Sequence, residues 1–201
     1  MIKNIIFDLG RVIYTFWPLK DMIKLGFSEA QAGRIMEHVF NHPAWRDADR
    51  GLITINEHIN KSQKDFPDIA QDLQKVFCDG WIDRVITVMP QSLDFYHEVK
   101  RRGFKIYIIT DFPEDAFAHV RARDAFFDEA DGIVVSAHEK LLKPDPAIFR
   151  CLLDRYKLAA EECLFIDDLQ NNIAAAKDLG MQGIQFVSIE DCKRQFEELV
   201  K

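Results

Sequence analysis

The chain has 201 residues, of which 48% are hydrophobic and 29% charged, and its formal net charge is −7. This length predicts one ordinary domain with a sizeable insertion, and the composition is typical of a soluble globular protein. The net negative charge argues against a nucleic-acid or anionic-membrane partner. It still allows an anionic substrate, because one lysine and a metal ion can outweigh the weak overall field at the site.

The first predicted element is a buried strand over residues 4–8, which ends at Asp8. Residues 15–88 are then predicted to be almost wholly helical, because apolar side chains recur near helical spacing. Helix starts at Ser28 and Thr54 fit a capping box, in which the hydroxyl and the third residue after it satisfy each other's backbone donors. We therefore predict a small all-helical cap inserted after the first strand.

From about residue 90 the pattern changes to alternating helices and strands. Predicted helices begin at Pro90, at Asp145-Pro146, at Asn171 and after Ser188, and a further helix is predicted near residues 113–126. Predicted strands cover residues 104–109, 133–135, 164–166 and 184–187. This alternation predicts an α/β fold with a doubly wound (Rossmann-like) parallel sheet. The predicted core domain covers residues 1–14 and 89–201, and the predicted cap domain covers residues 15–88.

Polar groups follow the apolar strands at the edge where the carboxyl ends of a parallel sheet meet. Asp8 follows four apolar residues and precedes a Leu9-Gly10 turn. A carboxylate in that place can attack phosphorus and form an aspartyl-phosphate. The backbone N–H groups of Leu9 and Gly10 can cradle the phosphoryl oxygens. Taken alone, Asp8 could equally cap a turn or a helix.

The other sheet-end groups predict a metal ion and a bound phosphate. Asp167 and Asp168 are adjacent carboxylates after an apolar strand, and they repel each other unless a cation such as Mg²⁺ lies there. Thr110 can donate its hydroxyl to a phosphate oxygen while Asp111 organises the loop, although a helix N-cap is an alternative. Lys143 can supply the counter-charge for the nucleophile and the phosphate.

The cysteines and the N-terminal residues indicate the cellular compartment. The cysteines show neither CxxC nor metal-ligand spacing, and Cys151 and Cys163 lie in or beside apolar stretches, which favours core positions. Residues 1–4 lead directly into a strand without room for a signal peptide, and no apolar run approaches transmembrane length. We expect a cytoplasmic protein without a membrane partner; the sequence does not distinguish a monomer from a homodimer.

Together, four segments resemble those of the haloacid dehalogenase-like hydrolase superfamily. They are, in chain order, Asp8-Leu9-Gly10-Arg11-Val12, Thr110-Asp111, Lys143-Pro144 and Asp167-Asp168. Their shared order and spacing carry the resemblance, and the helical insert resembles the family's small helical cap. Within the superfamily, the segments Phe7–Gly10 and Asp49–Gly51 with Thr54 are similar to the bacterial glucose-1-phosphate phosphatases and the phosphatase half of soluble epoxide hydrolase.

The resemblance implies a Mg²⁺-dependent phosphatase that acts on a small phosphorylated metabolite, such as glucose 1-phosphate, through an aspartyl-phosphate. It implies that Asp8 is the nucleophile and that Asp8, Asp168 and the Gly10 carbonyl hold the metal, with Asp167 as a second ligand or water-holder. By the same resemblance, Thr110 binds the phosphate and Lys143 clamps its charge.

One position departs from the superfamily pattern. Most of its phosphatases carry a second Asp two residues after the nucleophile, which protonates the leaving group and then activates water. Gly10 occupies that position, and Arg11 follows where glycine is usual. The sequence therefore shows no obvious residue for the general acid–base step. General acid–base catalysis typically raises the rate by about 10²–10⁴-fold. We expect a preference for good leaving groups unless another group, for example one on the cap, supplies the proton.

Two further functions remain open beside the phosphatase. A metal-independent 2-haloacid dehalogenase would also use Asp8 without a second Asp, but it has no use for the Asp167-Asp168 pair. A catalytically weak or inactive binding protein is the other alternative. The cap is expected to set specificity, and the side chains that could contact the substrate are Trp17, His42, Trp45, Arg46 and Arg50.

Overall fold

The computed structural model describes all residues from Met1 to Lys201 and centres on a five-stranded parallel sheet with the strand order β3-β2-β1-β4-β5. The strands are β1 (Asn4–Phe7), β2 (Lys105–Thr110), β3 (Gly132–Val135), β4 (Cys163–Asp167) and β5 (Gln182–Gln185). In the register, Phe7 lies opposite Ile108 on β2 and Ile166 on β4, so β4 runs one residue and β2 two residues past the end of β1 at the same edge of the sheet. The predicted α/β fold is confirmed.

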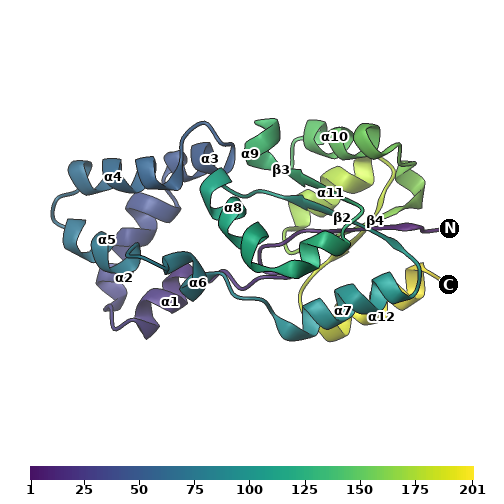
Figure 1. The fold of residues 1–201 in the computed structure, drawn as a ribbon, viewed down its shortest axis with the longest axis horizontal. Helices are drawn as coiled ribbons and strands as arrows, with labels where there is room; N and C mark the ends of the chain where they lie inside the picture. The colour runs from purple at the N-terminus through teal and green to yellow at the C-terminus, as the bar shows by residue number, and fades with distance from the viewer.

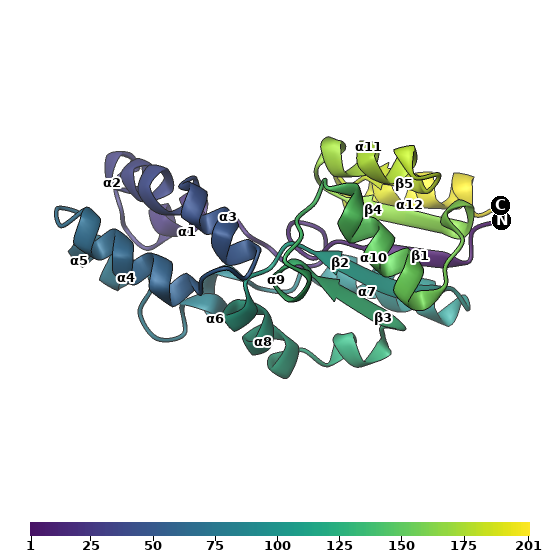
Figure 2. The ribbon, with the colours of Figure 1, turned by 90° about the horizontal axis from the view of Figure 1, so that it is seen from above.

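Helices cover both faces of the sheet because β1, β2 and β4 carry apolar side chains on both sides. On one face Ile6 packs with α10 and α11, and on the other Phe7 packs with α7 and α12 (Figures 1 and 2). The helices of this region are α7 (Pro90–Arg101), α8 (Glu114–Arg123), η2 (Ala125–Glu129), α9 (Ser136–Glu139), α10 (Pro146–Tyr156), η3 (Ala160–Glu162), α11 (Gln170–Asp178) and α12 (Ile189–Leu199).

The helical insert, residues 15–88, lies beyond the carboxyl edge of the sheet (Figures 1 and 2). Its helices are α1 (Pro18–Lys24), α2 (Glu29–Ile35), η1 (Met36–Phe40), α3 (Pro43–Asp49), α4 (Ile55–Asp65), α5 (Ala70–Val76) and α6 (Trp81–Val85). Both predicted capping boxes are present, at Ser28 and Thr54. Aromatic pairs hold the helices together, with ring centroids 4.7 Å apart for Phe40 and Trp45.

Two antiparallel segments join the insert to the sheet. The Thr15 N–H donates to the Thr87 carbonyl at 2.8 Å, and Tyr14 pairs with Val88. These contacts lie where the sequence predicts the domain boundaries, although the division into a core and a cap stays a prediction.

Some predicted bounds are wrong. The last strand lies two residues earlier than predicted, because Ile184 is its one buried side chain whereas Val187 is 75% exposed. The helix predicted over residues 113–126 ends at Arg123 and is followed by a 3₁₀ segment. Helix α9 was not predicted, because four residues leave no periodicity to detect.

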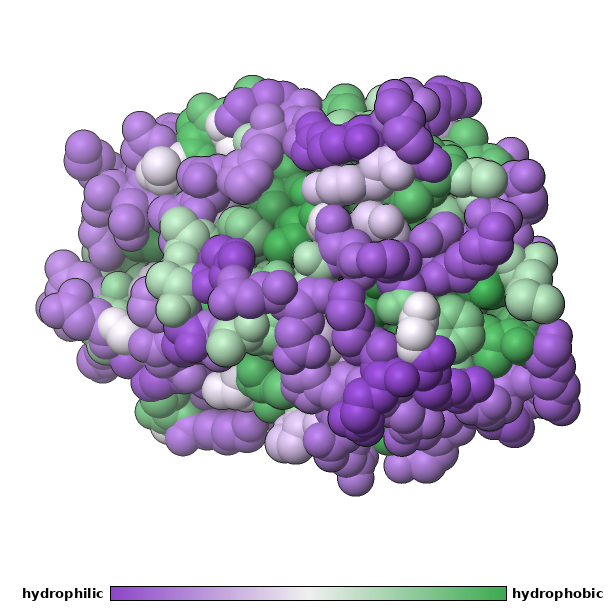
Figure 3. Space-filling view, turned by 45° about the vertical axis from the view of Figure 1, so that its right-hand side comes forward, coloured by the Kyte–Doolittle hydropathy of each residue, from purple (hydrophilic) through white to green (hydrophobic).

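The outer surface is mainly polar. Figure 3 shows one face of the molecule, on which hydrophobic residues appear as patches between hydrophilic side chains. None of the helices combines the length and the apolarity that a membrane span requires. Cys163 is buried in the core, as expected, whereas Cys151 is only half-buried. Its predicted core position is thus met only in part.

Candidate active site at the carboxyl edge of the sheet

Asp8 is placed by the end of β1 and the turn that follows. Its backbone N–H donates to the Ile166 carbonyl on β4 at 2.9 Å, which continues the ladder by one residue. The Leu9 carbonyl then accepts from the N–H of Tyr14 at 2.8 Å, and Arg11 adopts a left-handed φ of 57°. This tight turn leaves the Asp8 carboxylate at the edge of the sheet, 7% exposed.

Lys143 connects the carboxylates of two strands. Its Nζ lies 2.8 Å from Asp8 Oδ1 and 2.7 Å from Asp167 Oδ2, and its side chain is 2% exposed. Burial opposes the charged ammonium, but attraction by Asp8 and Asp167, with a contribution from Asp111, outweighs it and raises the pKa of Lys143. The lysine therefore stays protonated and carries the only positive charge buried among these acids.

The two acids after β4 have different surroundings. Asp167 is fully buried, and its Oδ1 accepts from the Leu169 N–H at 2.8 Å and from Asn172 Nδ2 at 2.9 Å, while Oδ2 faces Lys143. The Asp168 side chain is 17% exposed and has Arg11 Nη1 at 3.5 Å from Oδ2. Asp167 thus has both oxygens engaged by the protein, whereas Asp168 keeps one oxygen free.

The acid cluster fits a hard divalent cation. Asp8, Asp167 and Asp168 each offer a carboxylate oxygen within 4.8 Å of the others. Burial raises the pKa of Asp8 and of Asp168, and repulsion by Asp167 adds to both shifts, although Lys143 and Arg11 oppose them. Carboxylate oxygens are the ligands that Mg²⁺ takes in proteins, and its charge would relieve this repulsion.

Thr110 and Asp111 follow β2 beside the cluster. The Thr110 Oγ1 is buried and has no hydrogen-bond partner, which is uncommon for an interior hydroxyl. Asp111 Oδ1 accepts from the Lys143 N–H at 3.0 Å, and its other oxygen lies 3.6 Å from Arg46. Asp111 therefore holds the loop that carries Lys143, while the Thr110 hydroxyl is left without a partner in the protein.

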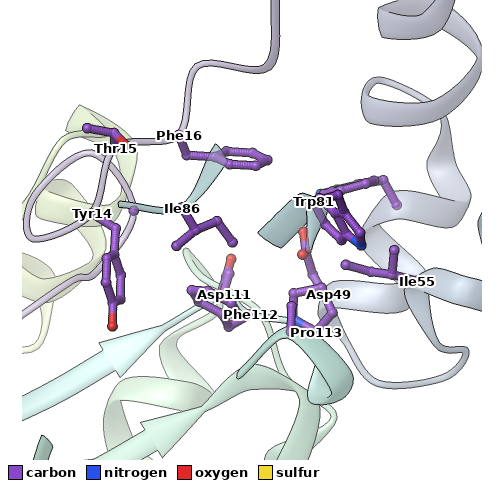
Figure 4. Close-up of a pocket in the computed structure, with 13 residues that line it drawn as sticks. Tyr14, Thr15, Phe16, Asp49, Ile55, Trp81, Ile86, Asp111, Phe112 and Pro113 are labelled. Carbon is purple, nitrogen blue, oxygen red and sulfur yellow. The ribbon is translucent and has the colours of Figure 1, made fainter. Parts of the chain in front are cut away.

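A cavity of about 140 Å³ lies between these residues and the insert (Figure 4). It is lined by Gly10, Tyr14, Thr15, Phe16, Trp45, Asp49, Ile55, Trp81, Ile86, Asp111, Phe112, Pro113 and Ala116. Eight of these thirteen residues are hydrophobic. In Figure 4, the carboxylates of Asp49 and Asp111 project toward the space beneath Phe16.

Asp49, at the end of α3, was not among the site residues predicted from the sequence. It is 8% exposed, and its carboxylate has no hydrogen-bond or ion-pair partner in the protein. Burial, with added repulsion from Asp111, raises the pKa of Asp49 to about 7, against the opposing effect of Arg46 and Lys143. The sequence offered one indication of a functional role for Asp49. The segment Asp49–Gly51 contributed to the family resemblance, but the resemblance assigned no role to Asp49.

The five cap residues that were expected to contact the substrate lie in different parts of the structure. Trp45 lines the cavity, and Arg46 donates to the Lys143 carbonyl at 3.2 Å. Trp17 lies beneath Arg11, with 4.7 Å between the guanidinium carbon and the ring centroid, in a neighbouring groove. His42 caps α3 by accepting from the Ala44 N–H, and Arg50 is exposed; neither lines the cavity.

This fold and this arrangement of acids, lysine and hydroxyl define a hydrolase of the haloacid dehalogenase type. The family model for the haloacid dehalogenase-like hydrolases matches residues 2–180, and the chain belongs to that family. The resemblance read from the four sequence segments is thus confirmed.

Its relatives include named phosphatases. The sesquiterpene phosphatase astK of Aspergillus oryzae is 30% identical over 196 residues, which are 94% of this chain and 93% of that protein. The D-ribitol-5-phosphate phosphatase of Bacteroides thetaiotaomicron is 24% identical and is aligned over 92% of each chain.

Solved structures confirm the fold. A haloacid dehalogenase family enzyme of Bacteroides thetaiotaomicron superposes with a TM-score of 0.76 at 22% identity, over 97% of this chain and 98% of that one. The same enzyme has been solved with magnesium and inorganic phosphate. The L-2-haloacid dehalogenase of Xanthobacter autotrophicus superposes with a TM-score of 0.64 at 16% identity, over 98% of this chain and 83% of that one.

Proposed function

We propose that this protein is a Mg²⁺-dependent phosphatase that hydrolyses a small phosphate monoester through an aspartyl-phosphate on Asp8. One observation carries the proposal: a buried lysine bonded to Asp8 and Asp167 lies beside a buried, unpaired Thr110 hydroxyl. A nucleophile, a positive charge and an unused donor at one sheet edge suit attack on a phosphoryl group.

In this proposal, Asp8, Asp168 and the Gly10 carbonyl hold the Mg²⁺, which neutralises phosphoryl charge and orients the phosphate when it is bound. Asp167 holds metal-bound water and Lys143 rather than the ion itself, because the protein already engages both of its oxygens.

The phosphoryl group is bound by a second set of groups. Thr110 donates to one phosphoryl oxygen, Lys143 attracts the group's charge, and the N–H groups of Leu9 and Gly10 cradle it. Asp111 contributes by holding the Lys143 loop.

The cavity favours an apolar alcohol as the leaving group. The family resemblance suggests glucose 1-phosphate, but the wall offers only a few polar side chains, Thr15, Asp49 and Asp111 among them, beside Phe16 and Trp45. Burying a sugar's hydroxyls without partners costs free energy, whereas aromatic and aliphatic walls suit an apolar group. A related protein is named a sesquiterpene phosphatase, which supports this preference.

The test is a screen of phosphate monoesters with Mg²⁺ and with excess chelator. We expect phosphate release only with Mg²⁺, faster from hexyl or geranyl phosphate than from glucose 1-phosphate. Full activity in chelator together with chloride release from 2-chloropropionate would favour the dehalogenase alternative. Absence of turnover on every monoester would favour the inactive binding protein.

A further inference from the structure

Asp49 differs from the other acids near the cavity. Asp49 is 8% exposed, and the carboxylate of so buried a residue normally has a hydrogen-bond or ion-pair partner, because an unpaired buried charge is costly. Asp111, the other acid in the wall, is held by the Lys143 N–H and faces Arg46. Asp49 alone projects into the cavity with its carboxylate unused (Figure 4).

Contacts between the end of α3 and the α9 segment after β3 hold Asp49 in this position. Ser136 Oγ donates to the Asp49 carbonyl, and the same hydroxyl accepts from the Phe112 N–H at 2.9 Å. Lys140 Nζ donates to the Gly51 carbonyl. The carbonyls of Asp49 and Gly51 at the end of α3 are thus both held by side chains from the carboxyl edge of the sheet.

The same cavity contains the position where the family's usual acid is missing. Gly10 lines it, and no atom lies within 4 Å of the place that a Gly10 side chain would occupy. The other wall side chains that can carry a proton are engaged elsewhere: Tyr14 donates its hydroxyl to Asp124 at 2.6 Å, the Thr15 hydroxyl pairs with that of Thr87, and Asp111 accepts from the Lys143 N–H. Asp49 is therefore an acid in the wall of the same cavity as Gly10 that has no partner in the protein.

We propose that Asp49 is the general acid and base of the reaction and that the helical insert supplies the proton that Gly10 cannot. This inference rests on the proposed phosphatase function. An apolar alkyl alcohol is a poor leaving group, so its departure needs a proton more than that of an aryl alcohol.

In the first step, an Asp8 oxygen bonds to phosphorus while the bond from phosphorus to the alcohol oxygen breaks. The Asp49 carboxyl gives its proton to that oxygen, so the alcohol leaves neutral and Asp49 becomes a carboxylate. In the second step, Asp49 takes a proton from water as the water oxygen bonds to phosphorus. The bond from phosphorus to Asp8 then breaks, which releases phosphate and restores both acids.

The charge environment suits both roles. The titratable and charged groups that face Asp49 are Asp111, Arg46 and Lys143. Burial and Asp111 hold its pKa near 7, so that the protonated and ionised forms are both accessible near neutral pH.

The test compares substrates that differ in their need for a proton. In Asp49→Asn, with Mg²⁺, we expect hydrolysis of hexyl phosphate to fall by about 10²–10⁴-fold. Release of the first equivalent of dinitrophenol from 2,4-dinitrophenyl phosphate should fall by less than about tenfold, because that leaving group needs no proton. It should appear as a burst equal to the enzyme concentration, since the second step has lost its base.

Two further variants make the test specific. Asp47→Asn, on the same helix but outside the cavity wall, should leave both rates unchanged. Gly10→Asp should restore hexyl phosphate hydrolysis in the Asp49→Asn background by at least about tenfold, because it returns an acid to the usual position.

Equal losses on both substrates, or no loss on either, would overturn the role of Asp49 while leaving the phosphatase function standing. A parent protein that hydrolyses neither ester with Mg²⁺ would overturn the proposed function and this inference with it. The melting temperature of each variant separates loss of fold from loss of chemistry.

Discussion

At the scale of single residues, Thr110 offers a sharp distinction between stability and function. Its buried hydroxyl makes no hydrogen bond in the protein, so the folded state gains nothing from it. In Thr110→Val we expect an unchanged or higher melting temperature. A hydrogen bond to a charged group is worth about 1.5–3 kcal/mol, so kcat/KM and the affinity for inorganic phosphate should fall by roughly 10–100-fold.

The readout is a melting curve together with inhibition by inorganic phosphate, measured on the same preparation. A variant that melts far below the parent would show that the hydroxyl has a structural partner. Unchanged phosphate inhibition would show that Thr110 does not contact the phosphoryl group.

Residue patterns also show what the sequence could predict at this scale. Asp8 and Asp167 were expected at one sheet edge because each ends an apolar strand, and Lys143 was expected there as their counter-charge. The structure brings the three within hydrogen-bonding distance. The unpaired state of Asp49 could not be predicted, because it depends on which groups surround a side chain after α3 packs against Ser136.

At the scale of elements, Gly51 controls how closely α3 approaches α9. It has a φ of +68°, and a Cβ there would meet the Ala137 carbonyl oxygen at 2.5 Å and the Ala137 Cα at 2.9 Å. Both are backbone atoms, so the end of α3 must move away in Gly51→Ala, carrying Asp49 with it. We expect hydrolysis of hexyl phosphate to fall by at least about tenfold and the protein to lose roughly 1–3 kcal/mol of stability.

Gly33 provides the matched control, because it lies inside α2 and a Cβ added there would meet no atom within 4 Å. Gly33→Ala should stabilise the protein by about 0.5–1 kcal/mol without changing activity. Equal effects of the two substitutions on kcat/KM would contradict the close-approach account.

Asp131 joins α7, β2 and the start of β3 at the opposite end of the sheet. Its oxygens accept from Lys100 Nζ at 2.7 Å, Lys105 Nζ at 2.8 Å and the Ile106 N–H at 2.9 Å. Burial raises the pKa of Asp131, but these hydrogen bonds outweigh it and lower the pKa from 3.8 to about 2. A depressed pKa in the folded state stabilises the protein above the unfolded value, and this stabilisation is lost as the pH falls through the folded value.

Asp131→Asn should therefore reduce the free energy of unfolding at pH 7 by about 1 kcal/mol, a value that allows for solvent screening. The difference from the parent should shrink as the pH falls from about 4 toward 2. Urea unfolding of both proteins at several pH values measures this difference in the free energy of unfolding. A difference that stays constant across this range would show that the contribution is steric rather than ionic.

At the scale of the whole molecule, the site exists only where the insert meets the sheet. The alternation of strands and helices followed from apolar periodicity, which the chain carries locally, so the α/β fold was predictable. The cavity was not, because its walls come from segments as distant as Gly10, Asp49 and Asp111. The missing acid at Gly10 was visible in the sequence, but its proposed replacement depends on the docking of the whole insert.

Trapping the covalent intermediate tests the central claim most directly. The parent protein is mixed with ³²P-labelled phenyl phosphate and Mg²⁺, quenched in acid within milliseconds and digested for peptide mapping. We predict label on the peptide that contains Asp8, and none in Asp8→Asn, which keeps the shape but loses the nucleophilic charge. Label on another residue, or near-normal turnover by Asp8→Asn, would contradict the account.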